Sequence, residues 1–338
     1  MAMITGILAA LAVASAAGAM PVTVEVQARG QTVPVGTAAA DAADDPAIWR
    51  NRRDPKASLI IATDKKAGLY VYGLDGKVRH FEQAGHLNNV DLVDLGAQGV
   101  IAAASDRNDK TQARLALYKL DTATGHLTPL GAVTGGAGEA YGVCLMRQGG
   151  QLFAFSVLKA GDIHQVRIDL GAAQPVGTIV RSLKLATQTE GCVADGRTST
   201  LYVGEEDRGI WSFDARPQGP VEGKLVAAVD NAQLTADVEG LALAAKGGKG
   251  GWLVASSQGD NAYALFKLPD MKPAGRFRVV KGAHGGTEET DGIDLALGSF
   301  GPDYRGGLMV VQDGHNEPDA QNFKLVAWKD VLAALKKR

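Results

Sequence analysis

The chain has 338 residues, a formal net charge of −2, and 46% apolar and 21% charged residues. This composition is ordinary for a globular protein and provides enough apolar residues for a large core. The near-neutral charge argues against nucleic acid as a partner, because nucleic-acid binders usually carry a marked excess of basic residues.

The first residues differ from the rest of the chain and predict a secretory signal peptide. They are small and apolar, and they end in two A-x-A patterns, Ala14-Ser15-Ala16 and Ala17-Gly18-Ala19, which are typical of a cleavage site. No Lys or Arg precedes the apolar stretch, which is atypical of such a peptide. We expect a signal peptide over 1–19, a mature domain over 20–338, and export to the periplasm or the medium. No later stretch is apolar for long enough to span a bilayer, so we expect no membrane association after cleavage.

Six apolar runs recur at an almost constant interval, and each has a polar residue at or near its start. The steps between anchor residues are 46, 50, 49, 49 and 52 residues. Such a period is typical of architectures that repeat one structural unit. The runs are DDPAIW (44–49), NNVDLV (88–93), YGVCLM (141–146), EGCVAD (190–195), EGLALA (239–244) and DGIDLA (291–296).

Two further strand-like runs follow the anchor run in each repeat. The first ends in polar residues, as in LIIATDKK (59–66) and LYVGEEDR (201–208). The second, as in AYALFKL (262–268) and FKLVAWK (323–329), alternates apolar and polar residues and so predicts one buried face.

Repeated units of this kind predict an all-β fold, a six-bladed β-propeller with four-stranded antiparallel blades. We expect Val22–Val35 to complete the last blade and close the ring, and WKDVLAALKKR (328–338) to form a short C-terminal helix. The innermost strand of each blade lines the central channel of a propeller. The polar residues at the starts of these strands, and in the loops beside them, should therefore converge on one rim.

The mature chain contains two cysteines, Cys144 and Cys192, both in apolar strand-like runs. Export would permit a disulfide bond between them. We favour the alternative that both are buried thiols that act as small apolar residues.

The residues predicted at the rim include many acids. A group of carboxylates at one opening repels itself strongly unless cations lie among its members. Ca²⁺ suits such a site because it accepts six to eight oxygen ligands in loose geometry, whereas the absence of a Cys cluster and of HExxH disfavours zinc. The acids are Asp44, Asp45, Asp64, Glu190, Glu205, Glu206, Asp237, Glu239, Asp291, Asp294 and Asp313.

Basic residues lie among these acids, namely Lys65, Lys66, Arg107 and Lys159, with Tyr141 nearby. A multiply charged anion held between Ca²⁺ and these bases would satisfy both sets, and phosphate fits best. The chain has no GxxxxGK[ST], no Cys-x5-Arg loop, no RHGxRxP and no GxSxG, so no covalent nucleophile is indicated. The remaining route is attack by a water molecule that the metal activates.

From Asp41 to Trp328 the chain resembles the β-propeller phytases, because many of their motifs occur here in the same order. The motifs are DAADDPAIW, TDKKAGLYVYGLDGK, LNNVDL, QTEGCVAD, EEDRGIW, DVEGLAL, ASSQGDNAYALF, TDGIDLALGSFGPDY, VVQDG and QNFKLVAW. The resemblance implies a 3-phytase type phosphoric monoester hydrolase. Its reaction would be calcium-dependent hydrolysis of myo-inositol hexakisphosphate (phytate) to phosphate and lower inositol phosphates. It also implies two neighbouring phosphate sites, one for cleavage and one for affinity.

The resemblance also implies roles for individual residues. It assigns the calcium ligands of the cleavage centre to Asp44, Glu190, Asp237, Glu239, Gln258 and Asp291. It assigns a structural calcium site to Asp45 with the backbone carbonyls near Pro46 and Val90. It assigns phosphate binding to Lys65, Lys66, Arg107, Tyr141 and Lys159. Glu206 resembles an acid that helps to hold metal or water, and the catalytic set is therefore expected to be Glu190, Glu206, Asp44 and Asp291.

The sequence departs from the family pattern near its C-terminal end. Gly285 and His315 stand where the pattern has acids, while Asp313 and Asn316 remain as expected metal ligands. This loss puts a tight, stabilising calcium site in doubt but leaves the catalytic set intact.

Two alternatives differ in function from a phytase. A calcium-dependent propeller lactonase or esterase would share the fold, but its mostly neutral substrates would not need the basic cluster. A non-catalytic exported propeller would have scattered polarity and exposed aromatic residues, whereas only 6% of residues here are aromatic. We expect a monomer.

Overall fold

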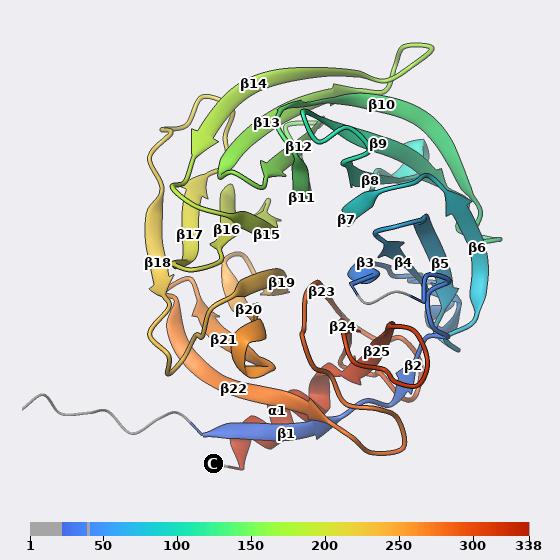
Figure 1. The fold of residues 1–338 in the computed structure, drawn as a ribbon, viewed down its shortest axis with the longest axis vertical. Helices are drawn as coiled ribbons and strands as arrows, with labels where there is room; N and C mark the ends of the chain where they lie inside the picture. The colour runs from blue at the N-terminus through green and yellow to red at the C-terminus, as the bar shows by residue number, and fades with distance from the viewer. Residues whose placement is uncertain (1–21, 39–40, 338) are drawn as a thin grey trace, which may run out of the picture.

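In a computed structural model of the chain, residues 22–38 and 41–337 are described. They form six β-sheets arranged as blades around a central axis (Figure 1). The predicted six-bladed all-β propeller is therefore confirmed, whereas the predicted signal peptide over 1–19 lies outside the described residues. Within the described ranges, no helix is long and apolar enough to cross a membrane.

The first three blades are four-stranded antiparallel sheets, and their strands run in chain order from the channel outward. The first contains β3 (Ala43–Trp49), β4 (Leu59–Asp64), β5 (Gly68–Gly73) and β6 (Val78–Gln83). The second contains β7 (Leu87–Asp94), β8 (Val100–Asp106), β9 (Gln112–Leu120) and β10 (Leu127–Ala137). The third contains β11 (Ala140–Gln148), β12 (Gln151–Leu158), β13 (Asp162–Asp169) and β14 (Val176–Lys184).

The last three blades include the segments that close the ring. The fourth contains β15 (Thr189–Asp195), β16 (Thr200–Glu205), β17 (Gly209–Asp214) and β18 (Lys224–Ala228). The fifth contains β19 (Val238–Lys246), β20 (Gly250–Ser257), β21 (Ala262–Leu268), β22 (Lys272–Val280) and the added β1 (Thr23–Gln27). The sixth contains β23 (Ile293–Leu297), β24 (Gly307–Asp313), β25 (Asn322–Ala327) and β2 (Gly30–Gln31). Short 3₁₀ turns lie at Pro55–Ala57, Gly96–Gln98 and Gln258–Asp260, and the predicted C-terminal helix is α1 (Trp328–Lys336).

The N-terminal segment closes the ring, as predicted, but it joins two blades rather than one. β2 pairs antiparallel with β25 and supplies the outermost strand of the sixth blade. β1 pairs parallel with β22, so the fifth blade has five strands (Figure 1). Arg29, between β1 and β2, ion-pairs with Asp330 of α1 at 2.6 Å and fixes the helix beside the closure.

Six large clusters make up most of the apolar core of the described residues, and each lies between two adjacent blades. Ile61 of β4 packs toward the second blade and its neighbour Ile60 toward the sixth, and both are fully buried. The prediction of one buried face, which concerned the third strand of each blade, was wrong for β25, because all six of its residues are buried. Both faces are buried because every blade is stacked between two others, so alternate side chains enter two different clusters.

Cys144 in β11 and Cys192 in β15 form a disulfide bond between the inner strands of the third and fourth blades. The favoured prediction of two free thiols was wrong. The two residues are 48 positions apart, about one repeat, and the repeat places equivalent positions of successive inner strands next to each other. Their Cα atoms are 5.8 Å apart, which is the usual span of a disulfide bond.

Replacing both Cys144 and Cys192 with Ala will lower the free energy of unfolding by about 2–4 kcal/mol, because the cross-link restricts the unfolded chain. Denaturant unfolding followed by circular dichroism measures this loss. Unfolding in dithiothreitol, which reduces the bond in the unfolded chain, should lower the free energy of unfolding of the wild-type protein. It should leave that of the double variant unchanged. Equal unfolding free energies for the two proteins would show that the bond contributes nothing.

Candidate active site

A β-bulge in each of the first five inner strands places a polar residue at the mouth of the channel. The strand pairing shifts register around Asp44 in β3, Asn88 in β7, Tyr141 in β11, Glu190 in β15 and Glu239 in β19. A bulge releases residues from the ladder and re-aims their side chains. In the sixth blade, Asp291 lies just before β23 and needs no bulge.

The glycine after several of these acids allows neighbouring inner strands to approach closely. A Cβ atom on Gly191 would lie 2.1 Å from the carbonyl oxygen of Glu239, and one on Gly240 would lie 2.8 Å from that of Asp291. Gly240 N also donates to the carbonyl of Asp291 at 3.2 Å. The acid–glycine pairs are therefore interblade contacts rather than isolated turns, and they bring the acids of successive blades together.

The second strand of each blade brings further groups to the same mouth, because it runs antiparallel to the first and ends where the first begins. Lys65, Arg107, Lys159, Glu206 and Gln258 each come within two residues of the ends of β4, β8, β12, β16 and β20, respectively.

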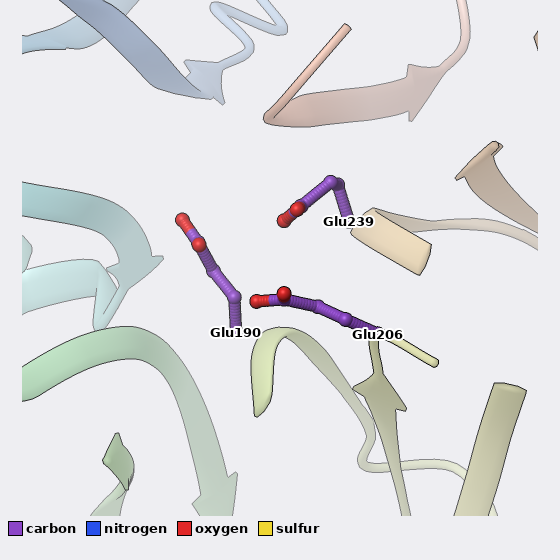
Figure 2. Close-up of side chains that lie close together, drawn as sticks. All are labelled: Glu190, Glu206 and Glu239. Atoms are coloured by element: carbon purple, nitrogen blue, oxygen red, sulfur yellow. The ribbon is translucent and has the colours of Figure 1, made fainter. Parts of the chain in front are cut away.

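Three glutamates point toward one another across the mouth (Figure 2). One carboxylate oxygen each from Glu190, Glu206 and Glu239 lies within 4.8 Å of the others, and all three residues are buried. They come from β15, the turn after β16, and β19. This is an arrangement in which a cation would be held by oxygen atoms from three segments of two blades.

Asp44 and Asp291 lie on the other side of the same group, around Lys65. The Nζ atom of Lys65 is 3.3 Å from Asp291 and 3.6 Å from Asp44, and its side chain is 9% exposed. Gln258 Nε2 donates to Asp291, and Asn88 Nδ2 donates to Glu190 Oε1 at 2.7 Å. The structure therefore gathers the predicted residues Asp44, Glu190, Glu206, Glu239, Gln258 and Asp291 into one basin, which we name the acidic basin.

Burial raises the pKa of Asp44, and burial with repulsion from neighbouring acids raises the pKa values of Glu190 and Glu239 well above their usual range. Burial is also the main cause that raises the pKa of Glu206 to about 7 and that of Asp291 to about 8. Buried oxygens without a hydrogen-bond partner include both of Asp44, one of Glu206 and one of Glu239. Unpaired buried oxygens are costly, and a cation at this place would satisfy them.

Arg107, Lys159 and Tyr141 form a cationic wall beside the acidic basin. The guanidinium carbon of Arg107 is 5.6 Å and Lys159 Nζ is 4.9 Å from the centroid of the Tyr141 ring. Burial raises the pKa of Tyr141, and repulsion from Glu190 and the other acids of the basin raises it further. The Tyr141 side chain therefore lies close to the carboxylates of the acidic basin. Lys66 lies further out, with a side chain that is 36% exposed and 3.3 Å from Asp41.

Asp45 points away from the acidic basin into the channel below it. Val90 N donates to Asp45 Oδ2 at 3.0 Å, and Asp45, Pro46 and Val90 line a cavity of about 40 Å³ together with Asp91 and Asp294. A cavity of this size holds about one water molecule or ion. The predicted structural set of Asp45, Pro46 and Val90 is thus brought together, apart from the catalytic set.

Three other predicted metal ligands lie at different places. Asp237 lies near Glu206, whose pKa is raised mainly by burial and further by the charge of Asp237. Asp313 and Asn316 are held instead by Lys324, whose Nζ is 2.8 Å from Asp313 Oδ2 and donates to Asn316 Oδ1 at 2.9 Å.

One acid predicted at the rim has a structural role instead, and two residues that contact the site were given no role in the sequence analysis. Glu205 lies at the predicted end of its strand, but it accepts hydrogen bonds from Ala186 N, Thr187 and Trp211 Nε1, so its role is structural. Asn88, which donates to Glu190, begins the NNVDLV run and was expected at the rim as a neutral oxygen donor, but it was given no role in the site. Asp41, which ion-pairs with Lys65 and Lys66, was also missed.

The raised pKa values predict that the metal-free protein loses stability as the pH rises. Glu206 and Asp291 titrate near pH 7 and 8 when folded but near 4 when unfolded, so the folded state binds more protons between these limits. The free energy of unfolding should therefore fall from about pH 4 to about pH 8. Urea unfolding of EDTA-treated protein measures the slope, which should be shallower in Glu206→Gln. A free energy that rises over this interval would contradict the assignment.

Two comparisons with known proteins agree on one family. The profile of the family described as Phytase matches residues 1–338. A 3-phytase of Bacillus subtilis (strain 168) is 40% identical over 329 residues, which cover 92% of this chain and 85% of the relative. A chain of the solved structure titled "Crystal Structure of Mitotic Checkpoint Complex" matches with a TM-score of 0.49 at 14% identity, over 93% of this chain and 88% of that chain, a likeness that carries no argument. The family profile and the Bacillus relative place this chain in the phytase family.

Proposed function

We propose that the protein hydrolyses the phosphate monoesters of phytate in a calcium-dependent reaction, releasing inorganic phosphate and lower inositol phosphates. The observation that carries this proposal is the acidic basin itself, in which buried carboxylate oxygens without hydrogen-bond partners lie beside a lysine and a cationic wall. Acids and bases crowded into one opening suit a divalent cation together with a polyanionic substrate.

The acidic basin fits calcium because its donors are carboxylate and amide oxygens from several segments. Bound Ca²⁺ would supply positive charge that polarises the phosphate and acidifies a water molecule. The proposed ligands are Asp44, Glu190, Asp237, Glu239, Gln258 and Asp291. Asp45, with the carbonyls of Pro46 and Val90, is proposed to hold a structural ion in the channel cavity.

The chain's own residues position the substrate and move the proton. Lys65, between Asp44 and Asp291, is placed to bind the phosphate that is cleaved, whereas Arg107, Tyr141 and Lys159 are placed to bind a neighbouring phosphate, with Lys66 at the margin. Glu206, with a pKa of about 7, is suited to accept a proton from the attacking water. The water oxygen forms a bond to phosphorus while the ester bond between phosphorus and the inositol oxygen breaks, and the inositol oxygen leaves as a hydroxyl after taking up the proton from Glu206 or from solvent. Fixing the reactants in this way is mainly a positional and electrostatic effect.

Export to the periplasm or the medium is part of the proposal. The disulfide bond between Cys144 and Cys192 supports it, since such bonds persist mainly in oxidising compartments. A signal peptide over 1–19 and a monomeric state remain predictions.

A lactonase is the main alternative, because it would use calcium on the same fold. The proposal predicts phosphate release from phytate and no hydrolysis of a neutral lactone when both are assayed with the same calcium-loaded protein. Lys65 and the cationic wall favour the polyanion. Lactone hydrolysis without phosphate release would overturn the proposal, and inertness toward both substrates would support a non-catalytic binding protein.

A further inference from the structure

Lys324 of β25 is a fully buried lysine surrounded by side-chain oxygens. Its Nζ atom lies 2.8 Å from Asp313 Oδ2 and donates to Asn316 Oδ1 at 2.9 Å and to Asn322 Oδ1 at 2.7 Å. The two amide oxygens accept hydrogen bonds from the ammonium, and the carboxylate oxygen is its ion-pair partner. Buried charged groups in proteins are usually paired and hydrogen-bonded, as this ammonium is.

The oxygens around Lys324 are fixed in orientation by other hydrogen bonds. Asn322 Nδ2 donates to the carbonyl of Thr32 at 3.1 Å, and Asn316 Nδ2 donates to that of Ala320 at 2.8 Å. Either amide would lose both of its bonds if it were flipped. Asp313 Oδ1 accepts from the backbone N–H groups of Glu288 and His315, each at 3.2 Å, so its second oxygen is directed toward the lysine.

The same group of residues does not fit a calcium ion. Calcium takes six to eight oxygens and favours several carboxylates, whereas the side chains around Nζ offer one carboxylate and two amides, and the ammonium already occupies their centre. Gly285 has no side chain that could bind a metal. A Cβ atom at this position would lie 3.1 Å from Lys324 Nζ, so the lysine occupies the space that a side chain would need. His315 is directed toward Glu288, with Nδ1 and Oε2 3.7 Å apart. A divalent ion would have to expel a buried charge of its own sign.

We propose that Lys324 is the built-in cation of the sixth blade and replaces a metal ion in the cage of Asp313, Asn316 and Asn322. The lysine joins the end of β24, the loop after it and β25. Through Asn322 and Thr32 it also joins the N-terminal segment that closes the ring. Closure of the ring at this blade therefore needs no calcium, unlike the acidic basin. This inference does not rest on the proposed phytase activity.

The test compares Asp313→Asn with the wild-type protein in calcium and in EDTA. We expect the variant to lower the thermal midpoint by roughly 5–10 °C, and by the same amount in both conditions, because it breaks a buried ion pair and removes no metal. Equilibrium dialysis should find the same number of calcium ions per chain in both proteins. A loss of stability seen only in calcium, with one fewer ion bound, would overturn the proposal.

Asn316→Ala is the milder variant should Asp313→Asn fail to fold. It removes one oxygen from the cage while keeping the ion pair, and its smaller loss of stability should again be equal in calcium and EDTA. Lys324→Met, alone and combined with Asp313→Asn, completes a double-mutant cycle. The double variant should lose less stability than the sum of the losses of the two single variants. Strictly additive losses would show that the two residues do not act on each other.

Discussion

Replacing Glu190 with Gln will lower the turnover number for phytate by about 100-fold to 1000-fold, the usual loss when one pre-organised electrostatic group is removed from an active site. A carboxylate oxygen of Glu190 lies within 4.8 Å of those of Glu206 and Glu239, and Glu190 is close enough to Asp44 and Asp291 for their charges to affect its pKa. Glutamine keeps an oxygen that can accept from Asn88 but removes the charge, so the change acts on chemistry rather than on packing. Phosphate release under saturating phytate and calcium measures the loss.

The same variant will not destabilise the metal-free protein, because it removes one of several mutually repelling buried charges. Its thermal midpoint in EDTA should equal or exceed that of the wild-type protein. Glu222→Gln is the matched control, since Glu222 is likewise followed by a glycine but is exposed in a loop. Unchanged turnover in Glu190→Gln would show that Glu190 has no part in the reaction.

Replacing Lys65 with Met will lower kcat/KM for phytate by about 100-fold, which corresponds to about 2.7 kcal/mol of lost transition-state binding. Lys65 is the cation nearest to both Asp44 and Asp291, and its side chain is almost completely buried. Methionine retains most of its volume but loses the charge and the three donors. Steady-state kinetics over a range of phytate concentrations measures the effect.

The stability of Lys65→Met should change in the direction opposite to that of Glu190→Gln. Removing the lysine leaves Asp44 and Asp291 without their counter-ion, so the metal-free variant should unfold at lower temperature than the wild-type protein. Lys66→Met should have a smaller kinetic effect because Lys66 is more exposed, and Lys77→Met on the surface should have none. Equal kinetics for Lys65→Met and Lys77→Met would remove Lys65 from the site.

The repeat of about fifty residues was enough to predict the blades and the ring, because identical units must bury their faces against one another. It could not predict that both faces of a blade are buried, since the apolar and polar alternation of FKLVAWK is weak evidence about exposure. Lys324, in the second position of that run, is fully buried and not on a solvated face. The oxygen cage of Asp313, Asn316 and Asn322, which the apolar pattern of the run does not reveal, makes that burial possible.

The candidate site was predicted mainly through motifs, and its physical basis appeared only in three dimensions. The spacing of the repeats was enough to predict that Glu190 and Glu239 lie at the channel mouth. The β-bulges that direct their side chains toward each other depend on strand register, which the sequence does not reveal. The disulfide bond could have been inferred from the match between its 48-residue separation and the repeat length. Asp313 and Asn316 look like metal ligands in sequence because Lys324, the residue that engages them, stands in an apolar run and shows no sign there of being paired with an acid.

Calcium titration of the metal-free protein tests the central claim most directly. The protein is stripped with EDTA, dialysed, and assayed for phosphate release from phytate while Ca²⁺ is added, with Glu239→Gln alongside as a variant of the acidic basin. We predict no release without calcium, saturable recovery as calcium is added, and a higher calcium requirement with lower maximal release for Glu239→Gln. Full phosphate release by the stripped protein, unchanged by added calcium, would contradict the account.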